Sequence, residues 1–176
     1  MHQVTFKPGT TITQQRRLEL LRHYLIDDAV ALPARAAAVL MLLCAQPLSR
    51  IHRLTRDDLL TIDGTPHLRL GDPPIPLPTP AAHLLHRLVD EAGRGGRWLF
   101  PGRLPDQPVA YATLHRRLRA SGFPLGEARI SALRQLVLQA PAPVIADALG
   151  FHQTTTTRQH ANAGGAWSRY PTNRNN

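Results

Sequence analysis

The sequence predicts a mainly α-helical protein with one small β-hairpin, an α+β fold class that rests on three observations. Apolar side chains recur at helical spacing in five segments, 14–26, 81–92, 111–122, 129–139 and 144–150. The segment 34–46 is apolar on nearly all sides, as expected of a helix at the centre of a core. Two short apolar segments, 59–62 and 67–70, flank Asp63-Gly64, a dipeptide typical of a hairpin turn.

The other segments are expected to be loops and chain ends. Residues 1–13 show no periodicity and predict a flexible N-terminal arm, followed by a single domain over 14–170 and a polar tail over 171–176. The stretch 72–80 is too rich in proline for a central strand and is expected to be an edge or extended segment. Thr55 has the residue type of a helix N-cap.

The charge of the chain points to nucleic acid as the first partner to consider. There are 21 Lys and Arg residues against 12 Asp and Glu, which gives a net charge of +9, and Lys7 is the only lysine. A basic protein of this kind attracts phosphates. The alternative is that genome composition favoured arginine and that the charge only keeps the protein soluble.

Several classes of protein do not fit the sequence. The apolar run 36–45 is about half of the ~20 residues that a membrane span needs, and no signal peptide opens the chain, so we expect a cytoplasmic protein. A single cysteine, Cys44, excludes an internal disulfide and is expected to be a buried thiol. His83 and His86 lack carboxylate or cysteine companions at ligand spacing, so we expect no metal and no cofactor.

Three short motifs follow one another along the chain: Leu48-Ser49-Arg50-Ile51, the segment from Trp98 to Gly102, and Leu133-Arg134. With the helices and hairpin around them, from about Ala31 to His160, they resemble the catalytic domain of the tyrosine recombinase and phage integrase family. Their order and spacing carry the resemblance more than any one motif does.

The resemblance implies a fold and a reaction. In that family a tyrosine attacks a DNA phosphodiester, and two arginines, a lysine and two His/Trp positions stabilise the transition state. Preorganised guanidinium groups suit this task because they bind the charged phosphate oxygens bidentately. Arg50 corresponds to the first arginine and Arg134 to the second, so the resemblance implies that both bind a phosphate.

The family's lysine and histidine positions are not matched. No lysine lies in the hairpin, and Arg69, which does, cannot donate a proton usefully because a guanidinium group keeps its proton in proteins. Arg69 is therefore expected only to bind phosphate. The two histidines that flank the second arginine correspond to Ser131 and Gln135.

The C-terminal motifs also depart from the family. Its Leu-Gly-His motif ends here in Phe151, with His152 one place late, and the usual nucleophile position falls on His160. We therefore expect a degenerate domain that binds duplex DNA without cleaving it. The first alternative is an active, divergent integrase with Tyr170 as its nucleophile, although Trp167 and Tyr170 are also spaced to pack one last helical turn onto the core.

The stretch 143–161 also resembles a helix-turn-helix. Ala146 is followed four residues later by Gly150, and a polar helix with Thr154 as its N-cap begins after a short turn. Such a helix presents hydroxyls and Arg158 to phosphates, although it could equally be a solvated polar helix. The candidate phosphate-binding residues are thus Arg50, Arg69, Arg134, His152, Thr154 and Arg158.

We expect duplex DNA as the partner, and a homo-oligomer is one form the protein could take on DNA. A second alternative is a helix-turn-helix regulator, or a protein-interaction module whose fold has outlived DNA binding. Whatever the function, Arg50 and Arg134 could each anchor a buried hydrogen-bond network or a carboxylate such as Asp57 or Asp58 in place of a phosphate.

Overall fold

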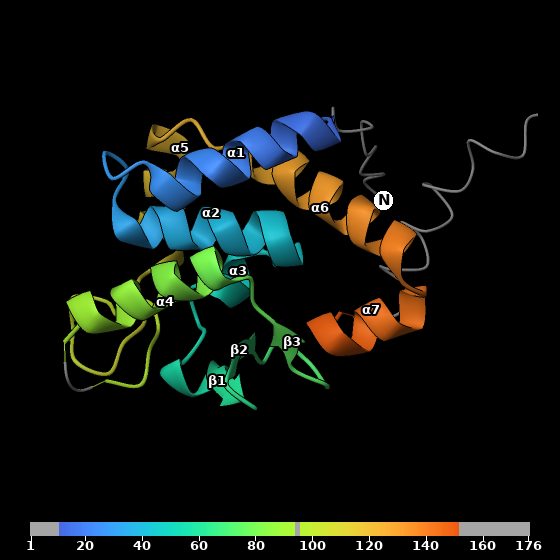
Figure 1. The fold of residues 1–176 in the computed structure, drawn as a ribbon. Helices are drawn as coiled ribbons and strands as arrows, with labels where there is room; N and C mark the ends of the chain where they lie inside the picture. The colour runs from blue at the N-terminus through green and yellow to red at the C-terminus, as the bar shows by residue number, and fades with distance from the viewer. Residues whose placement is uncertain (1–10, 94–95, 152–176) are drawn as a thin grey trace, which may run out of the picture.

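The fold of the chain is mainly helical with one small sheet, which confirms the predicted fold class (Figure 1). The computed structural model describes residues 11–93 and 96–151. Within them the α-helices are α1 (Gln14–Ile26), α2 (Leu32–Cys44), α3 (Leu48–Ile51), α4 (Thr79–Glu91), α5 (Tyr111–Ala120), α6 (Leu125–Gln139) and α7 (Ala142–Leu149). A short 3-10 helix, η1 (Arg56–Asp58), precedes the sheet.

Helix α2 is the centre of the core, as its apolar sequence predicts. It contacts α1, α4, α5 and α6, and its residues from Ala34 to Leu42 are all buried (Figure 1). The run Ala36 to Ala38 lets the neighbouring helices approach closely, because small side chains leave room for their larger ones. Cys44 is buried at the end of α2, and burial raises the pKa of its thiol to about 12, so the group stays neutral and unreactive.

Two arginines bind the carbonyl oxygens at the C-terminus of α2. Arg17 donates from Nη1 to the carbonyl oxygen of Leu42 at 2.6 Å, and Arg129 donates from Nε to that of Ala45 at 2.9 Å. Burial lowers the pKa of both guanidinium groups, and both remain charged near neutral pH. Cations at this end of a helix satisfy its free carbonyls and interact favourably with its dipole. They join α1 and α6 to the end of α2.

The hairpin forms where the sequence predicts it. Strands β1 (Leu59–Ile62) and β2 (Thr65–Leu68) are antiparallel, with Ile62 opposite Thr65. Asp63 and Gly64 have φ values of 49° and 76°, the left-handed conformation that a two-residue turn of this kind requires.

The second strand was expected over 67–70, but β2 begins and ends two residues earlier. The tight turn starts the strand directly after Gly64, and the chain leaves the sheet before Leu70. In the proline-rich segment, Ile75–Pro76 forms β3, which pairs only with β2, so the expected edge segment is confirmed.

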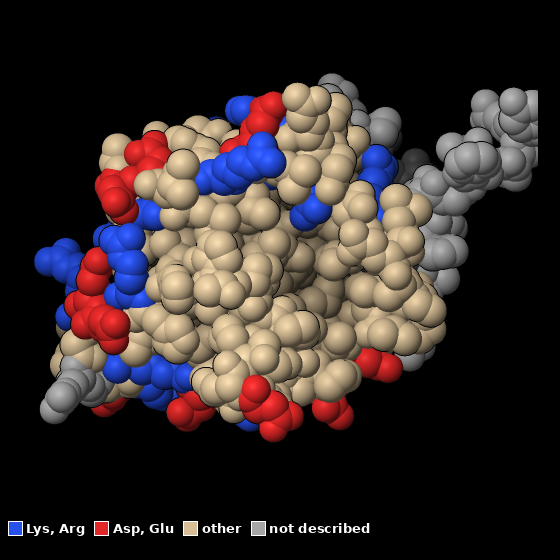
Figure 2. All heavy atoms as spheres, in the orientation of Figure 1, with Lys and Arg blue, Asp and Glu red and all other residues tan. Residues whose placement is uncertain are grey.

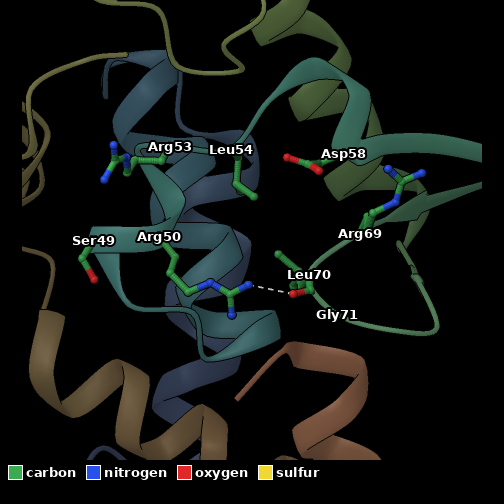
Figure 3. Close-up of a pocket in the computed structure, with 8 residues that line it drawn as sticks. All are labelled: Ser49, Arg50, Arg53, Leu54, Asp58, Arg69, Leu70 and Gly71. Atoms are coloured by element: carbon green, nitrogen blue, oxygen red, sulfur yellow. Dashed lines mark hydrogen bonds between the residues drawn. The ribbon is translucent and has the colours of Figure 1, made fainter. Parts of the chain in front are cut away.

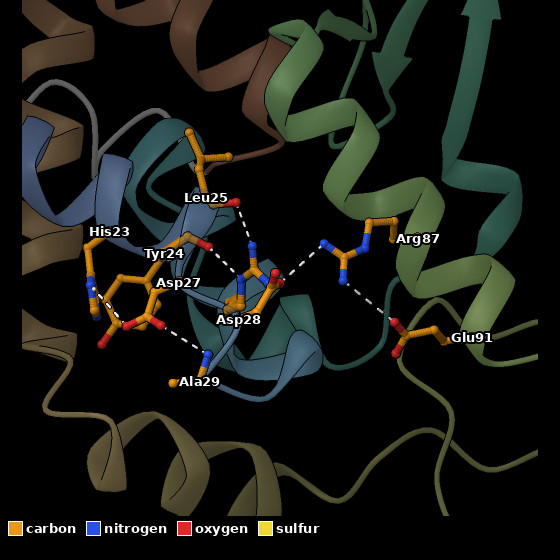
Figure 4. Close-up of polar contacts among 9 residues, drawn as sticks. His23, Tyr24, Leu25, Asp27, Asp28, Ala29, Arg87 and Glu91 are labelled. Atoms are coloured by element: carbon orange, nitrogen blue, oxygen red, sulfur yellow. Dashed lines mark hydrogen bonds and ion pairs between the residues drawn. The ribbon is translucent and has the colours of Figure 1, made fainter.

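A charged network ties the connection between α1 and α2 to α4 (Figure 4). Arg35 is 2% exposed and donates to the carboxylate of Asp28 and to the carbonyl oxygen of Tyr24. The hydrogen bond from Arg35, followed by its charge and by Arg87, lowers the pKa of Asp28. The pKa of Asp28 is lower in the folded protein than in the unfolded chain. Its interaction with Arg35 and Arg87 therefore stabilises the fold above the ordinary pKa of aspartate, and this stabilisation is lost as the pH falls through the lowered pKa.

The charged side chains are interspersed on the face shown in Figure 2. Arg and Asp or Glu side chains lie next to one another along its left and lower edges, and its centre is largely uncharged. The net charge of +9 is therefore not gathered into one basic patch on this face, and a candidate anion site has to be sought in local geometry.

Candidate functional site

Three arginines line one pocket between α3 and the end of the hairpin (Figure 3). The pocket has a volume of about 560 Å³ and is lined by Ser49, Arg50, Arg53, Leu54, Asp58, Arg69, Leu70 and Gly71. Figure 3 shows the Arg50 guanidinium pointing toward Leu70, with Arg53 and Arg69 to either side in this view. We call this the arginine pocket.

The one carboxylate of the arginine pocket is already engaged. Asp58 accepts hydrogen bonds at Oδ2 from the backbone N–H and the hydroxyl of Thr55, at 2.8 and 2.9 Å. This capping box closes η1 and confirms Thr55 as an N-cap residue. Arg53 and Arg69 are exposed, and within the described residues neither guanidinium group makes a hydrogen bond or an ion pair. The pocket thus carries net positive charge.

Arg50 differs from its two neighbours because its guanidinium group is bound to the backbone. Nη1 donates to the carbonyl oxygens of Leu149 and Gly150 at 2.9 and 3.0 Å, and Nη2 donates to that of Leu70 at 2.7 Å. A guanidinium group has more N–H donors than these bonds use, so donors on Nε and Nη2 remain for a phosphate oxygen. Arg50 therefore joins α3 to the hairpin and to the C-terminus of α7.

The backbone of the hairpin exit lies directly on the C-terminus of α7. The N–H of Asp72 donates to the carbonyl oxygen of Asp147 at 2.9 Å. A Cβ atom at Gly71 would lie 1.9 Å from that oxygen, and one at Gly150 would lie 2.3 Å from the carbonyl oxygen of Leu70. Gly150 also has a φ of 63°, so it ends α7 in the left-handed conformation. Both contacts require glycine.

Gln46 completes this junction from the end of α2. Its Nε2 donates to the carbonyl oxygen of Leu149 at 3.1 Å, so this carbonyl accepts from both Gln46 and Arg50. The Oε1 atom of Gln46 is buried and has no hydrogen-bond partner within the described residues.

The second predicted arginine lies elsewhere. Arg134, on α6, is half-buried and donates from Nη1 to the hydroxyl of Thr11 at 3.2 Å; it is not among the residues that line the arginine pocket. Ser131, one turn earlier on α6, is buried and donates to the carbonyl oxygen of Ile12 at 2.9 Å. Both side chains thus hold the end of the segment that was expected to be a loose arm.

The remaining predicted residues fall at or beyond the C-terminal limit of the described chain. Phe151 is half-buried against the core, with the Arg129 guanidinium 5.7 Å from its ring centre. Helix α7 ends at Gly150, which has the left-handed conformation, and the second helix of the predicted helix-turn-helix lies outside the described residues. The candidates His152, Thr154, Arg158, His160 and Tyr170 lie outside the described residues.

Sequence reasoning missed Arg53. The signal was present, because Arg53 follows Arg50 by three residues, a spacing that places two side chains on one side of a helical turn. The spacing Thr55-x-x-Asp58 is that of a capping box, so the sequence also held the signal that Asp58 binds Thr55 and leaves Arg53 without a carboxylate partner.

Neither a metal centre nor a membrane span is found in the part of the chain that the structure describes. No group of three or more His, Cys, Asp or Glu side chains there could hold a metal ion. None of its helices has both the length and the apolar character needed to cross a bilayer.

Comparison with known proteins gives matches at the level of structure only. No protein-family model matches the chain, and neither does any curated protein sequence. The Tn1549 transposon integrase, solved in complex with transposon right end DNA, matches 92% of this chain and 66% of its own, at a TM-score of 0.62 and 15% identity. A lambda integrase dimer bound to a COC′ core site matches 93% of this chain and 51% of its own, at a TM-score of 0.55 and 16% identity.

A lambda integrase tetramer bound to a Holliday junction gives a similar result, with a TM-score of 0.54, 17% identity and coverage of 92% of this chain and 51% of that one. The chain therefore has a tyrosine-recombinase-like fold, and the resemblance drawn from the sequence is confirmed at the level of fold. It spans about half to two thirds of the length of these integrases.

The contact between the hairpin exit and α7 makes a testable prediction. Replacing Gly71 by alanine should destabilise the protein by about 2–3 kcal/mol, because the new methyl group must push two backbones apart. Gly126→Ala is the matched control: this glycine lies in α6 with nothing near its Cβ position, so alanine should leave stability unchanged or raise it by up to about 1 kcal/mol. Urea denaturation followed by circular dichroism measures both, and equal stabilities would contradict the packing described.

Proposed function

We propose that this chain is a DNA-binding protein with a tyrosine-recombinase-like fold, that it contacts duplex phosphates through the arginine pocket, and that it does not cleave DNA. One observation carries the proposal: three arginine residues line one pocket whose only carboxylate, that of Asp58, already accepts two hydrogen bonds from Thr55. Guanidinium groups without an acidic partner bind phosphate oxygens strongly, because their N–H donors match the geometry of the anion.

The three arginines have different tasks in this proposal. Arg53 and Arg69 are exposed and supply charge to the DNA backbone. Arg50 offers only the donors that its three carbonyl bonds leave free, and its main task is to hold the pocket in shape. Arg134 does not line the pocket, and we propose that it holds the segment around Thr11 in place; a phosphate contact there remains a prediction.

The loss of cleavage follows from the proton transfers that strand cleavage needs. The only lysine, Lys7, lies far from the hairpin in sequence, and the hairpin residue Arg69 cannot protonate a leaving oxygen. Ser131, at a histidine position of the family, is buried and donates to a backbone carbonyl. Phe151, at another, has no group that can bind a phosphate or transfer a proton.

The segment after Phe151 is proposed to add further phosphate contacts. Gly150 is bound by Arg50, so the chain enters this segment next to the arginine pocket. If it forms the second helix of a helix-turn-helix, Thr154 and Arg158 are its phosphate ligands, together with His152. We further propose a single domain over 14–170, a cytoplasmic location, and self-association on DNA, in line with the DNA-bound dimer and tetramer among the similar structures.

Salt-dependent DNA binding tests the proposal. Fluorescence anisotropy with a random duplex of about 30 base pairs should give a salt slope that falls by roughly two phosphate contacts, or about 1.8 in log–log units, in Arg53→Ala/Arg69→Ala. The control Arg16→Ala/Arg22→Ala removes the same charge from α1 and should leave the slope nearly unchanged. Equal effects of the two pairs would contradict a phosphate site at the pocket, and no binding at low salt would favour a protein-interaction module.

Strand cleavage is tested separately on a suicide substrate. We expect no covalent protein–DNA adduct on a denaturing gel, because the proton donors of the family's reaction are not matched. An adduct that disappears in Tyr170→Phe would contradict this and establish the divergent integrase instead.

A further inference from the structure

A rigid loop between α4 and α5 presents an exposed leucine. Leu104 is 70% exposed at the tip of the segment 101–108. The N–H of Gly102 donates to the carbonyl oxygen of Gln107 at 2.8 Å, and Trp98 donates from Nε1 to that of Asp106 at 2.9 Å. Proline at both ends of the segment, Pro101 and Pro108, further limits its motion. The loop thus holds its apolar tip in one place.

The conformation of this loop depends on unusual backbone features. Asp106 adopts a φ of 56°, and a Cβ atom at Gly102 would lie 2.7 Å from the carbonyl oxygen of Pro108. Burial of an exposed leucine by a partner lowers the free energy, because apolar surface is removed from water. On a loop of fixed conformation, little side-chain or loop entropy is lost on binding.

An apolar groove lies beside the same loop. Two adjoining pockets share Pro101, Val109 and Arg117 in their linings. The smaller has a volume of about 190 Å³ and is lined by Pro33, Leu88, Glu91, Ala92, Phe100, Pro101, Val109 and Arg117. A cavity of about 150 Å³ can hold a benzene ring, so this pocket has room for a leucine side chain. The larger pocket, of about 470 Å³, lies under the loop itself.

We propose that a second copy of this chain occupies the groove, with Leu104 of each protomer in the smaller pocket of the other. The charges are complementary: Arg103 and Asp106 flank Leu104 on the loop, and the pocket lining holds Arg117 and Glu91, whose carboxylate also lies 3.8 Å from Arg87 of the same chain. All four charged residues are exposed. Opposite charges around an apolar anchor favour one orientation of the two chains.

The position of the loop allows both contacts to form at once. Because the loop borders the groove of its own chain, a single two-fold axis beside it places each loop on the other protomer's groove. Arg103 then meets Glu91 of the partner, and Asp106 meets Arg117 of the partner. This dimer uses none of the residues that line the arginine pocket and goes beyond the proposed DNA binding.

Sedimentation velocity of the full chain without DNA tests the proposal. Over a low- to high-micromolar concentration series, the wild type should show a sedimentation coefficient that rises from monomer toward dimer. Leu104→Ser should raise the dimer dissociation constant at least about ten-fold, because the apolar anchor is lost. Leu138→Ser is the matched control: Leu138 is 65% exposed on α6, and its replacement should leave the dissociation constant unchanged.

Charge reversal tests the orientation. Glu91→Arg and Arg103→Glu should each weaken the dimer, because like charges then face each other twice across the axis. An equimolar mixture of the two variants should regain dimer, since each remaining contact again joins opposite charges. The proposal would be overturned if the wild type stays monomeric, if Leu104→Ser and Leu138→Ser dimerise equally, or if the mixture of the two charge variants does not regain dimer. A monomeric wild type would leave the groove to another protein.

Discussion

The guanidinium group of Arg50 binds three carbonyl oxygens that belong to two distant parts of the chain, Leu70 at the hairpin exit and Leu149-Gly150 at the end of α7. The carbonyls at a helix C-terminus have no partners within the helix and carry its partial negative charge. A planar cation with several N–H groups can satisfy them and the hairpin carbonyl together. A lysine ammonium, as a single point charge, could not span the same three oxygens equally well.

The shape of the arginine pocket depends on this interaction. With the hairpin exit fixed to α7, Arg69 and Asp58 stay on the opposite side of the pocket from α3 and from Arg53, which lies in the turn directly after α3. The missing side chains of Gly71 and Gly150 permit the same contact, because a Cβ at either position would clash with backbone atoms. The positive pocket is thus a consequence of how the hairpin and α7 pack, as much as of the arginines themselves.

Much of the fold could be predicted from the sequence because its signals are local. The apolar run of α2 and the Asp63-Gly64 turn depend on neighbouring residues only, and both appear where expected. The site depends on contacts between distant residues: Arg50 and Leu149 are 99 residues apart, and no local pattern announces their hydrogen bond. For the same reason the resemblance could name Arg50 and Arg134 as phosphate ligands, but it could not show that Arg50 lines the arginine pocket and Arg134 does not.

The central claim is that Arg50 shapes the pocket while Arg53 and Arg69 bind the phosphate. NMR of the side-chain N–H groups of ¹⁵N-labelled arginine, recorded during titration with duplex DNA, tests this claim most directly. We expect the Arg50 N–H signals to show a guanidinium group with restricted rotation already in the free protein, and their chemical shifts to change little when DNA is added. The chemical shifts of Arg53 and Arg69 should change strongly. Averaged Arg50 signals in the free protein that sharpen and shift on DNA binding, with Arg53 and Arg69 unaffected, would contradict it.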